Sequence, residues 1–179
     1  LVRVYGFGPC SYIDSDPVTL IVNQSIEVTD QPDPSIICEG SNITFSVSAT
    51  GSVDTYEWRR NGIPVSGGNY SGYNTPTLTI TGVTTLNAGT FDVIISGIGG
   101  SCDQEISNPA TLTVNTRSSD PTSATAVPAT ICYGQSSILT LNGGGGGTGE
   151  VIQWYTGSCG GTPIGTGNNF LVNPTTTTT

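Results

Sequence analysis

The stretch Asn42–Ser48 reads NITFSVS, and every second residue in it is apolar. Thr55–Arg60 (TYEWRR) repeats the alternation with Trp58 on the apolar side, and so do Thr77–Thr81 (TLTIT) and Ala110–Val114 (ATLTV). A period of two predicts β-strands with one buried face, and the Gly, Pro and Asn residues between the runs are typical of turns. No stretch has a helical period. The fold class is therefore expected to be all-β, as a sandwich of short strands.

The composition limits the possible partners. The 179 residues include 25 Gly and 11 Pro, only 9% are charged, and the net charge is −9. Nucleic acid is excluded as a partner, because phosphate binding needs patches of Lys and Arg, and anionic membrane surfaces are excluded for the same reason. Because no run of 18 apolar residues occurs, no direct membrane insertion is expected.

The sequence contains a repeat whose length is that of one whole domain. Ser15–Asn23 (SDPVTLIVN) and Ser107–Asn115 (SNPATLTVN) share six of nine residues and lie 92 positions apart in the sequence. Cys10 and Cys102 are also 92 positions apart. A repeat of this length is about the size of one immunoglobulin-type sandwich domain.

A second pair of segments extends the repeat. Ile37–Gly40 (ICEG) corresponds to Ile131–Gly134 (ICYG), and Trp58 corresponds to Trp154. The expected domains are the last strands of one unit (1–23), a complete unit (26–115) and a unit lacking its last strands (122–179). Both ends of the sequence are expected to be cut. The residues expected in the cores are Trp58, Phe91 and Trp154.

The complete unit resembles an immunoglobulin-like (Ig-like) domain. Cys38, Trp58, Leu78-x-Ile80 and the turn Leu86–Phe91 carry the resemblance. The sequence departs from the antibody pattern at two positions. Phe91 replaces the tyrosine of the tyrosine corner, and Val93 stands where the second strand-F cysteine would be, with a cysteine displaced to Cys102.

The displaced pattern is similar to Ig-like and PKD-like repeats of large Bacteroidetes surface proteins. The third unit is closer still through Ile131–Gly134, the stretch Trp154–Pro163 (WYTGSCGGTP) and Val172–Thr179 (VNPTTTTT). The resemblance implies export by the type IX secretion system and display at the bacterial cell surface as an adhesin, gliding adhesins included.

The five cysteines agree with an oxidising, extracellular compartment. Cys38 and Cys102 fall in one complete unit and are expected to pair. Cys10 is expected to pair with a cysteine before Leu1. Cys132 and Cys159 have either partners beyond Thr179 or each other. Buried free thiols are the alternative, and a zinc site is disfavoured because the sequence lacks His and any C-x-x-C spacing.

Catalysis is not expected, because no His is present to serve as a base near neutral pH. The acids that a two-carboxylate hydrolase would need lie in predicted turns and include Glu39. Four of the acids pose a separate question: they are either exposed turn residues or ligands that bind Ca²⁺ at the junction of the first two units. These residues are Asp14, Asp16, Asp30 and Asp33. No other cofactor is expected.

Three functions from different classes remain. The first is a stalk or filament segment of an adhesin, in which neighbouring Ig-like domains of the same chain are the partners. The linkers Gln24–Pro34 and Thr116–Pro128 would then be extended, with Gly143–Gly147 as a flexible loop. The second is a module that binds glycans such as surface polysaccharide, through the loop tyrosines Tyr12, Tyr70 and Tyr73. Other cell-surface proteins are the alternative partners. The third is an accessory part of a secreted enzyme.

Overall fold

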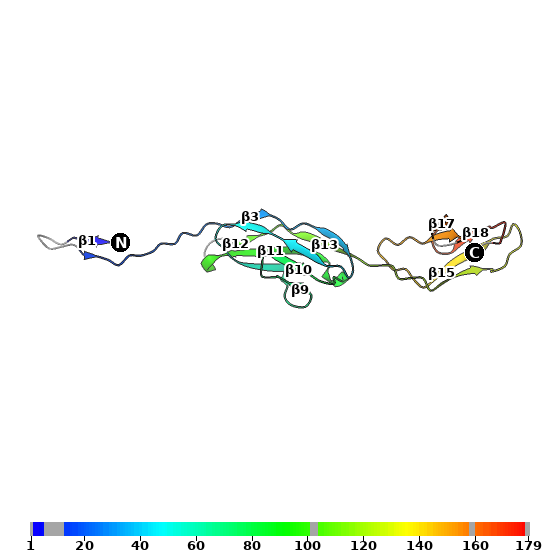
Figure 1. Ribbon diagram of the computed structural model, residues 1–179, viewed down its shortest axis with the longest axis horizontal. Helices are drawn as coiled ribbons and strands as arrows, with labels where there is room; N and C mark the ends of the chain where they lie inside the picture. Colours follow the sequence, from blue (N-terminus) through cyan, green and yellow to red (C-terminus); the bar gives the residue numbers. More distant parts are fainter. Residues whose placement is uncertain (1, 6–12, 101–103, 158–159, 178–179) are drawn as a thin grey trace.

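The computed structural model describes residues 2–5, 13–100, 104–157 and 160–177. The chain is elongated, with a first segment (up to Asn23), a middle unit (24–115) and a third unit (from Thr116) in a row (Figure 1). Apart from two 3-10 turns, η1 (Thr85–Asn87) and η2 (Ile98–Gly100), the regular elements are strands. The all-β expectation is confirmed. None of the helices in the described ranges is long and apolar enough to cross a membrane.

The middle unit is a two-layer sandwich. One layer contains β5 (Ile43–Ser46), β10 (Thr77–Ile80) and β9 (Tyr70–Ser71), with β3 (Glu27–Asp30) paired to β6 (Ser48–Thr50). The other has the order β4 (Ser35–Cys38), β13 (Ala110–Asn115), β11 (Gly89–Gly97), β7 (Val53–Arg60) and β8 (Ile63–Pro64), with β12 (Gln104–Ile106) also on β11. All of these pairs are antiparallel except β4 and β13, which are parallel.

The core of the middle unit surrounds Trp58. Trp58 and Phe91 are both fully buried, and Phe91 stacks on Phe45 with 5.0 Å between ring centroids. The indole N–H of Trp58 donates to the carbonyl of Thr75 at 2.9 Å, so the buried ring leaves no polar atom unpaired. All twelve buried hydrophobic residues of the described chain lie between Ile26 and Leu112. The hydrophobic stabilisation of the molecule is therefore concentrated in this one unit.

The third unit repeats only part of this plan. One sheet has the order β14 (Ser123–Val127), β15 (Ser137–Asn142) and β18 (Phe170–Val172), and the other pairs β16 (Gln153–Thr156) with β17 (Thr162–Thr166). Trp154 donates its indole N–H to the carbonyl of Gly167 at 2.8 Å, just as Trp58 does to Thr75. However, Trp154, which was expected in a core, stays partly exposed, and no hydrophobic residue in the described part of this unit is buried. The physical reason is that few strands of this unit pack over the Trp154 ring.

The first segment is a hairpin followed by extended chain. β1 (Arg3–Val4) pairs with β2 (Ile13–Asp14), and the Arg3 guanidinium binds both carboxylate oxygens of Asp14 at 2.6 and 2.7 Å. Residues 15–22 form no strand and lie away from the middle unit (Figure 1).

Each of the two stretches expected to be a linker contains a strand. Gln24–Pro34 contains β3, which pairs with β6, and Thr116–Pro128 contains β14, which pairs with β15. Their prolines lie outside the paired residues, where a missing N–H removes no ladder hydrogen bond. The spacing between units is accordingly shorter than the sequence suggested.

Candidate interaction surfaces at the junctions and the open groove

The N-terminal end of the middle unit is bonded directly to the chain that enters it. The Gln24 N–H donates to Ser52 Oγ at 2.9 Å, and the Ser52 N–H donates back to the Gln24 carbonyl at 3.1 Å. Asn23 Nδ2 also donates to the carbonyl of Ile98 at 3.4 Å. The middle unit thus begins at Gln24, and Asn23, the last residue of the first segment, contacts it through Ile98.

The C-terminal junction is bonded more extensively. The Thr116 N–H donates to Thr148 Oγ1 at 3.0 Å, and the Thr148 N–H donates to the Thr116 carbonyl at 3.1 Å. Ser119 and Gly145 exchange backbone hydrogen bonds of 3.1 and 3.0 Å. Because Asn115 ends β13, the chain passes from the middle unit into this ladder without a free residue. These hydrogen bonds hold the residues that follow β13 against the loop that contains Gly145 and Thr148.

The ladder depends on glycines that let two backbones approach closely. A Cβ on Gly147 would lie 2.2 Å from Ser118 Oγ and 2.5 Å from Ser118 N, and a Cβ on Gly144 would lie 2.7 Å from Pro121 Cα. Any side chain at either position would push the connecting chain away. The Gly143–Gly147 loop was expected to be flexible, and that expectation is wrong: the loop is bound to the junction.

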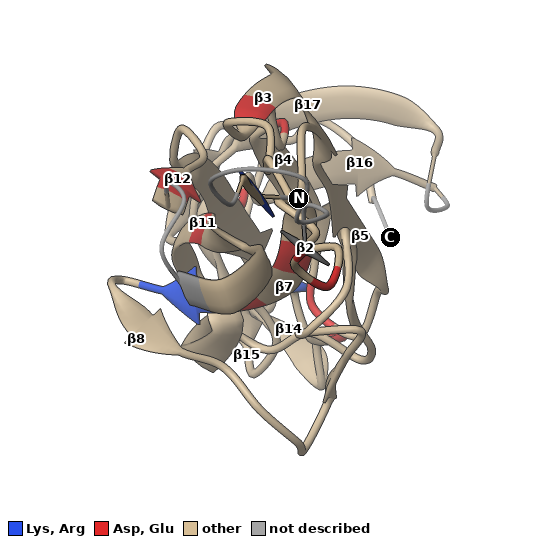
Figure 2. Cartoon of the chain, turned by 90° about the vertical axis from the view of Figure 1, so that its left-hand side faces the viewer, with Lys and Arg blue, Asp and Glu red and all other residues tan. Residues whose placement is uncertain are grey.

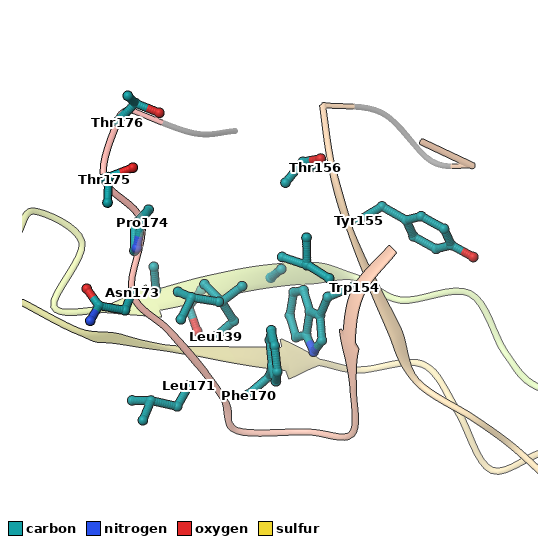
Figure 3. A pocket seen from close by; sticks show the side chains of 15 residues that line it. Leu139, Trp154, Tyr155, Thr156, Phe170, Leu171, Asn173, Pro174, Thr175 and Thr176 are labelled. Carbon is teal, nitrogen blue, oxygen red and sulfur yellow. The ribbon is translucent and has the colours of Figure 1, made fainter. Parts of the chain in front are cut away.

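An open groove of about 780 Å³ separates the two sheets of the third unit. Leu139, Trp154 and Phe170 point toward one another into this space, whereas Tyr155 points away (Figure 3). The lining residues include no charged side chain. A groove with apolar walls and a partly exposed tryptophan is a surface suited to binding an apolar strand or chain.

A serine motif occurs twice along the chain. In the middle unit the Val93 N–H donates to Ser107 Oγ at 3.0 Å, and the Ser107 N–H donates to the Val93 carbonyl at 3.0 Å. In the first segment the Val2 N–H donates to Ser15 Oγ at 3.0 Å, and the Ser15 N–H donates to the Val2 carbonyl at 2.9 Å. The first segment therefore holds the same strand connection as the middle unit, without a core beneath it.

The charged residues that the structure describes are spread over several elements. Figure 2 shows acidic residues on several separate elements, β2, β3 and β12 among them. The part-buried Arg59 guanidinium bonds Asp92 Oδ1 at 2.7 Å, and this hydrogen bond raises the pKa of Arg59. The exposed Arg3 guanidinium has its pKa raised by Asp14 in the same way. Both pairs cross-link neighbouring strands, and neither leaves a group available for proton transfer.

The structure does not gather the proposed calcium ligands. Within the described residues, no three His, Cys, Asp or Glu side chains are close enough to hold a metal ion. Asp14 bonds Arg3, and Asp30 lies in β3 opposite Ser48. Asp16 is exposed and lies in the first segment. Asp33 is also exposed and follows β3. Calcium binding by these four residues stays a prediction that no contact supports.

Cys38 ends β4 opposite Asn115, is exposed, and has no disulfide in the described chain. Its expected partner Cys102 lies outside the described residues, as do Cys10 and Cys159. Gln104, two residues beyond Cys102, pairs with Ser96 at the other end of β11. A disulfide requires Cα atoms about 4.4–6.8 Å apart, and the ladder between these ends is several times longer. The pairing of Cys38 with Cys102 therefore stays a prediction. Cys132 is also exposed with a free thiol.

Two of the tyrosines expected in exposed loops are described, and they differ. Tyr70 lies in β9 with its ring 6.4 Å from that of Phe91, and its hydroxyl accepts a hydrogen bond from Asn87 Nδ2 at 3.0 Å. It is partly buried at the edge of the core. Tyr73 is exposed, and Tyr12 lies outside the described residues.

Comparison with known proteins agrees with this fold. Residues 119–179 match the model of a family described as an Ig-like domain, CHU_C associated, which confirms the resemblance to Bacteroidetes Ig-like repeats for this part of the chain. The crystal structure of Rst D1-D2 is 15% identical, with a TM-score of 0.55, and the match covers 79% of this chain and 73% of that one. A chimeric titin Z1Z2 is 25% identical, with a TM-score of 0.44, over 54% of this chain and all of that one. No curated protein matches.

Proposed function

We propose that this chain is a non-enzymatic, force-transmitting spacer in an adhesin displayed on a bacterial cell surface. In this role the middle unit is a rigid element in a series of Ig-like units. Export by type IX secretion and a part in gliding belong to the same proposal, and they rest on the resemblance of the third unit to Bacteroidetes repeats.

The observation that carries the proposal is the parallel pair of β4 and β13. Ser35 lies opposite Leu112, and Cys38 lies opposite Asn115. The chain enters β4 from the N-terminal side of the unit and leaves from Asn115 at the other end (Figure 1). Tension along the chain would therefore pull the two strands past each other along their length.

Shear geometry gives mechanical resistance. In a parallel pair pulled from opposite ends, the inter-strand hydrogen bonds carry the load together, whereas a hairpin pulled open at one end loses them one by one. Sliding would also drag Ala110 and Leu112 out of the core, where both are buried. The covalent chain at Asn23–Gln24 and at Asn115–Thr116 then passes the load to the neighbouring segments.

The proposal is tested first on intact cells of the source organism. Antibodies raised against this chain are expected to stain cells that have not been permeabilised. Staining only after permeabilisation would contradict the surface location.

The mechanical part is tested by attachment under flow. Trp58→Ala in the full-length protein should cause cells to detach at lower shear, with the amount of surface protein unchanged, because the middle unit no longer resists extension. Leu86→Ala is the matched control, because Leu86 is exposed. Equal detachment of both variants would contradict a mechanical role.

A further inference from the structure

The peptide group between Asn115 and Thr116 is hydrogen-bonded to both of the units that it joins. Its carbonyl, on Asn115, accepts a hydrogen bond of 2.8 Å from the Glu39 N–H of the middle unit. Its N–H, on Thr116, donates to Thr148 Oγ1 of the third unit at 3.0 Å. The C=O and N–H of one peptide are fixed relative to each other, because the group is planar. Glu39 and Thr148 are therefore connected through a single rigid group.

We propose that the loop Gly143–Glu150 of the third unit is a docking site for the end of the last strand of the preceding unit, so that the two units move as one body. The partner is the neighbouring unit of the same chain, which the loop recognises through its backbone. The inference rests on the proposed spacer function and adds how successive units are held. Linked domains ordinarily move relative to each other, so coupling needs a specific contact of this kind.

The middle unit fixes the end of β13 on one side of the shared peptide. Asn115 is the last residue of the parallel pairing with β4, where it lies opposite Cys38. Glu39, the residue after β4, supplies the N–H that binds the Asn115 carbonyl. β13 is anchored further back by Ala110 and Leu112, which are buried in the core. The Asn115 carbonyl is therefore a fixed part of the middle unit.

The third unit holds Thr116 through all of its polar groups. The Thr116 N–H donates to Thr148 Oγ1 at 3.0 Å, and the Thr116 carbonyl accepts from the Thr148 N–H at 3.1 Å. The Thr116 hydroxyl donates to the carbonyl of Gly146 at 3.2 Å. Gly147 allows the approach, because a Cβ there would lie 2.5 Å from Ser118 N. No free residue separates this contact from the end of β13.

The receiving half of the contact occurs a second time, at the start of the middle unit. The Gln24 N–H donates to Ser52 Oγ, and the Ser52 N–H donates to the Gln24 carbonyl. Gln24 and Thr116 lie 92 positions apart, and Ser52 and Thr148 lie 96 positions apart, like the two tryptophans. A glycine precedes the hydroxyl residue in both loops, and a Cβ on Gly51 would overlap a carbonyl oxygen of the entering chain. The same docking geometry therefore recurs in both units.

Residual dipolar couplings of the backbone N–H groups test the proposal on the 179-residue chain, because they report the orientation of each unit separately. In the wild type, one alignment tensor should fit the couplings of the middle and third units together. Inserting Gly-Gly between Asn115 and Thr116 puts the two bonded groups on different peptides, so the common tensor should be lost. The matched control inserts Gly-Gly between Ser66 and Gly67, in an exposed loop of the middle unit, and should keep it.

Thr148→Val tests the docking side chain. Valine has nearly the shape of threonine but offers no acceptor to the Thr116 N–H, so the couplings of the third unit should shrink relative to those of the middle unit. Thr140→Val is the matched control, because the Thr140 hydroxyl bonds Asn169 Oδ1 at 3.1 Å within the third unit. Its couplings should match those of the wild type. If Thr148→Val fails to fold, the two insertions decide the question.

Separate tensors for the two units of the wild type would overturn the proposal. A common tensor that survives the insertion before Thr116 would also contradict it, because another contact would then hold the units together. Wild-type couplings in folded Thr148→Val would contradict the docking role of this hydroxyl. None of these results bears on the surface location or on the resistance to force, which are measured on cells.

Discussion

The middle and third units share a repeat and differ in closure. Both have a tryptophan whose indole N–H bonds a carbonyl before the next strand of the opposite sheet. Trp58 is fully buried, whereas Trp154 lines an open groove. The difference is β11, which covers Trp58 with Val93, Ile95 and Phe91. This central strand therefore distinguishes the closed core around Trp58 from the open groove beside Trp154.

Truncating the two tryptophans should separate the units most clearly. Trp58→Ala is expected to destabilise the middle unit by about 3–5 kcal/mol, because it opens a large cavity in a closed core. Trp154→Ala should cost the third unit much less, because its ring already contacts solvent. Urea denaturation followed by circular dichroism measures both changes. Equal losses in the two variants would mean that the third unit is also closed.

Replacing the serine of the repeated motif should give a smaller difference in stability between the middle unit and the first segment. Ser107→Ala should cost about 1–3 kcal/mol, because the Val93 N–H loses its acceptor in a buried place. Ser15→Ala removes the same contact in an exposed hairpin and should leave the urea midpoint of the middle unit unchanged. A shift of that midpoint by Ser15→Ala would indicate that the first segment supports the sandwich.

The ion pair of Arg59 and Asp92, which joins β7 to β11, should contribute less to the free energy of unfolding than the Ser107 hydroxyl does. A double-mutant cycle with Arg59→Gln and Asp92→Asn should give a coupling free energy of about 1 kcal/mol or less, since both side chains keep some contact with water. Added salt should reduce the coupling further. A coupling that salt does not change would argue for a pair shielded from solvent.

The smallest effect on stability is expected from Gly147→Ala, which acts on the junction alone. The new methyl group would push Ser118 away and open the ladder, leaving the middle unit as stable as before. Arg117 lies in this connection, so trypsin should cut after it faster than in the wild type. Gly146→Ala is the comparison variant, because Gly146 has open space at its Cβ, and its positive φ, which Gly147 does not share, adds backbone strain without a clash. Equal cleavage of the two variants would refute the close approach.

The sequence predicted most of the strands of the middle unit, because a period of two is a direct record of a sheet with one buried face. It missed β3, where only Val28 is apolar, and it missed the ladder at Thr116–Gly147, because hydrogen bonds between backbones leave no pattern of side chains. Tyr70 looked like an exposed loop residue because its contact with Phe91 joins distant parts of the chain. Trp154 is partly exposed because its burial depends on a strand equivalent to β11, which the described part of the third unit does not contain.

Extension of single molecules by atomic force microscopy tests the central claim, that the middle unit resists force and the third does not. About 90 residues span Ile26 to Asn115, so unfolding the middle unit under reducing conditions should add about 30 nm of chain in one abrupt step. The third unit should extend earlier, at low force. Gradual extension of the whole chain without such a step would contradict the account.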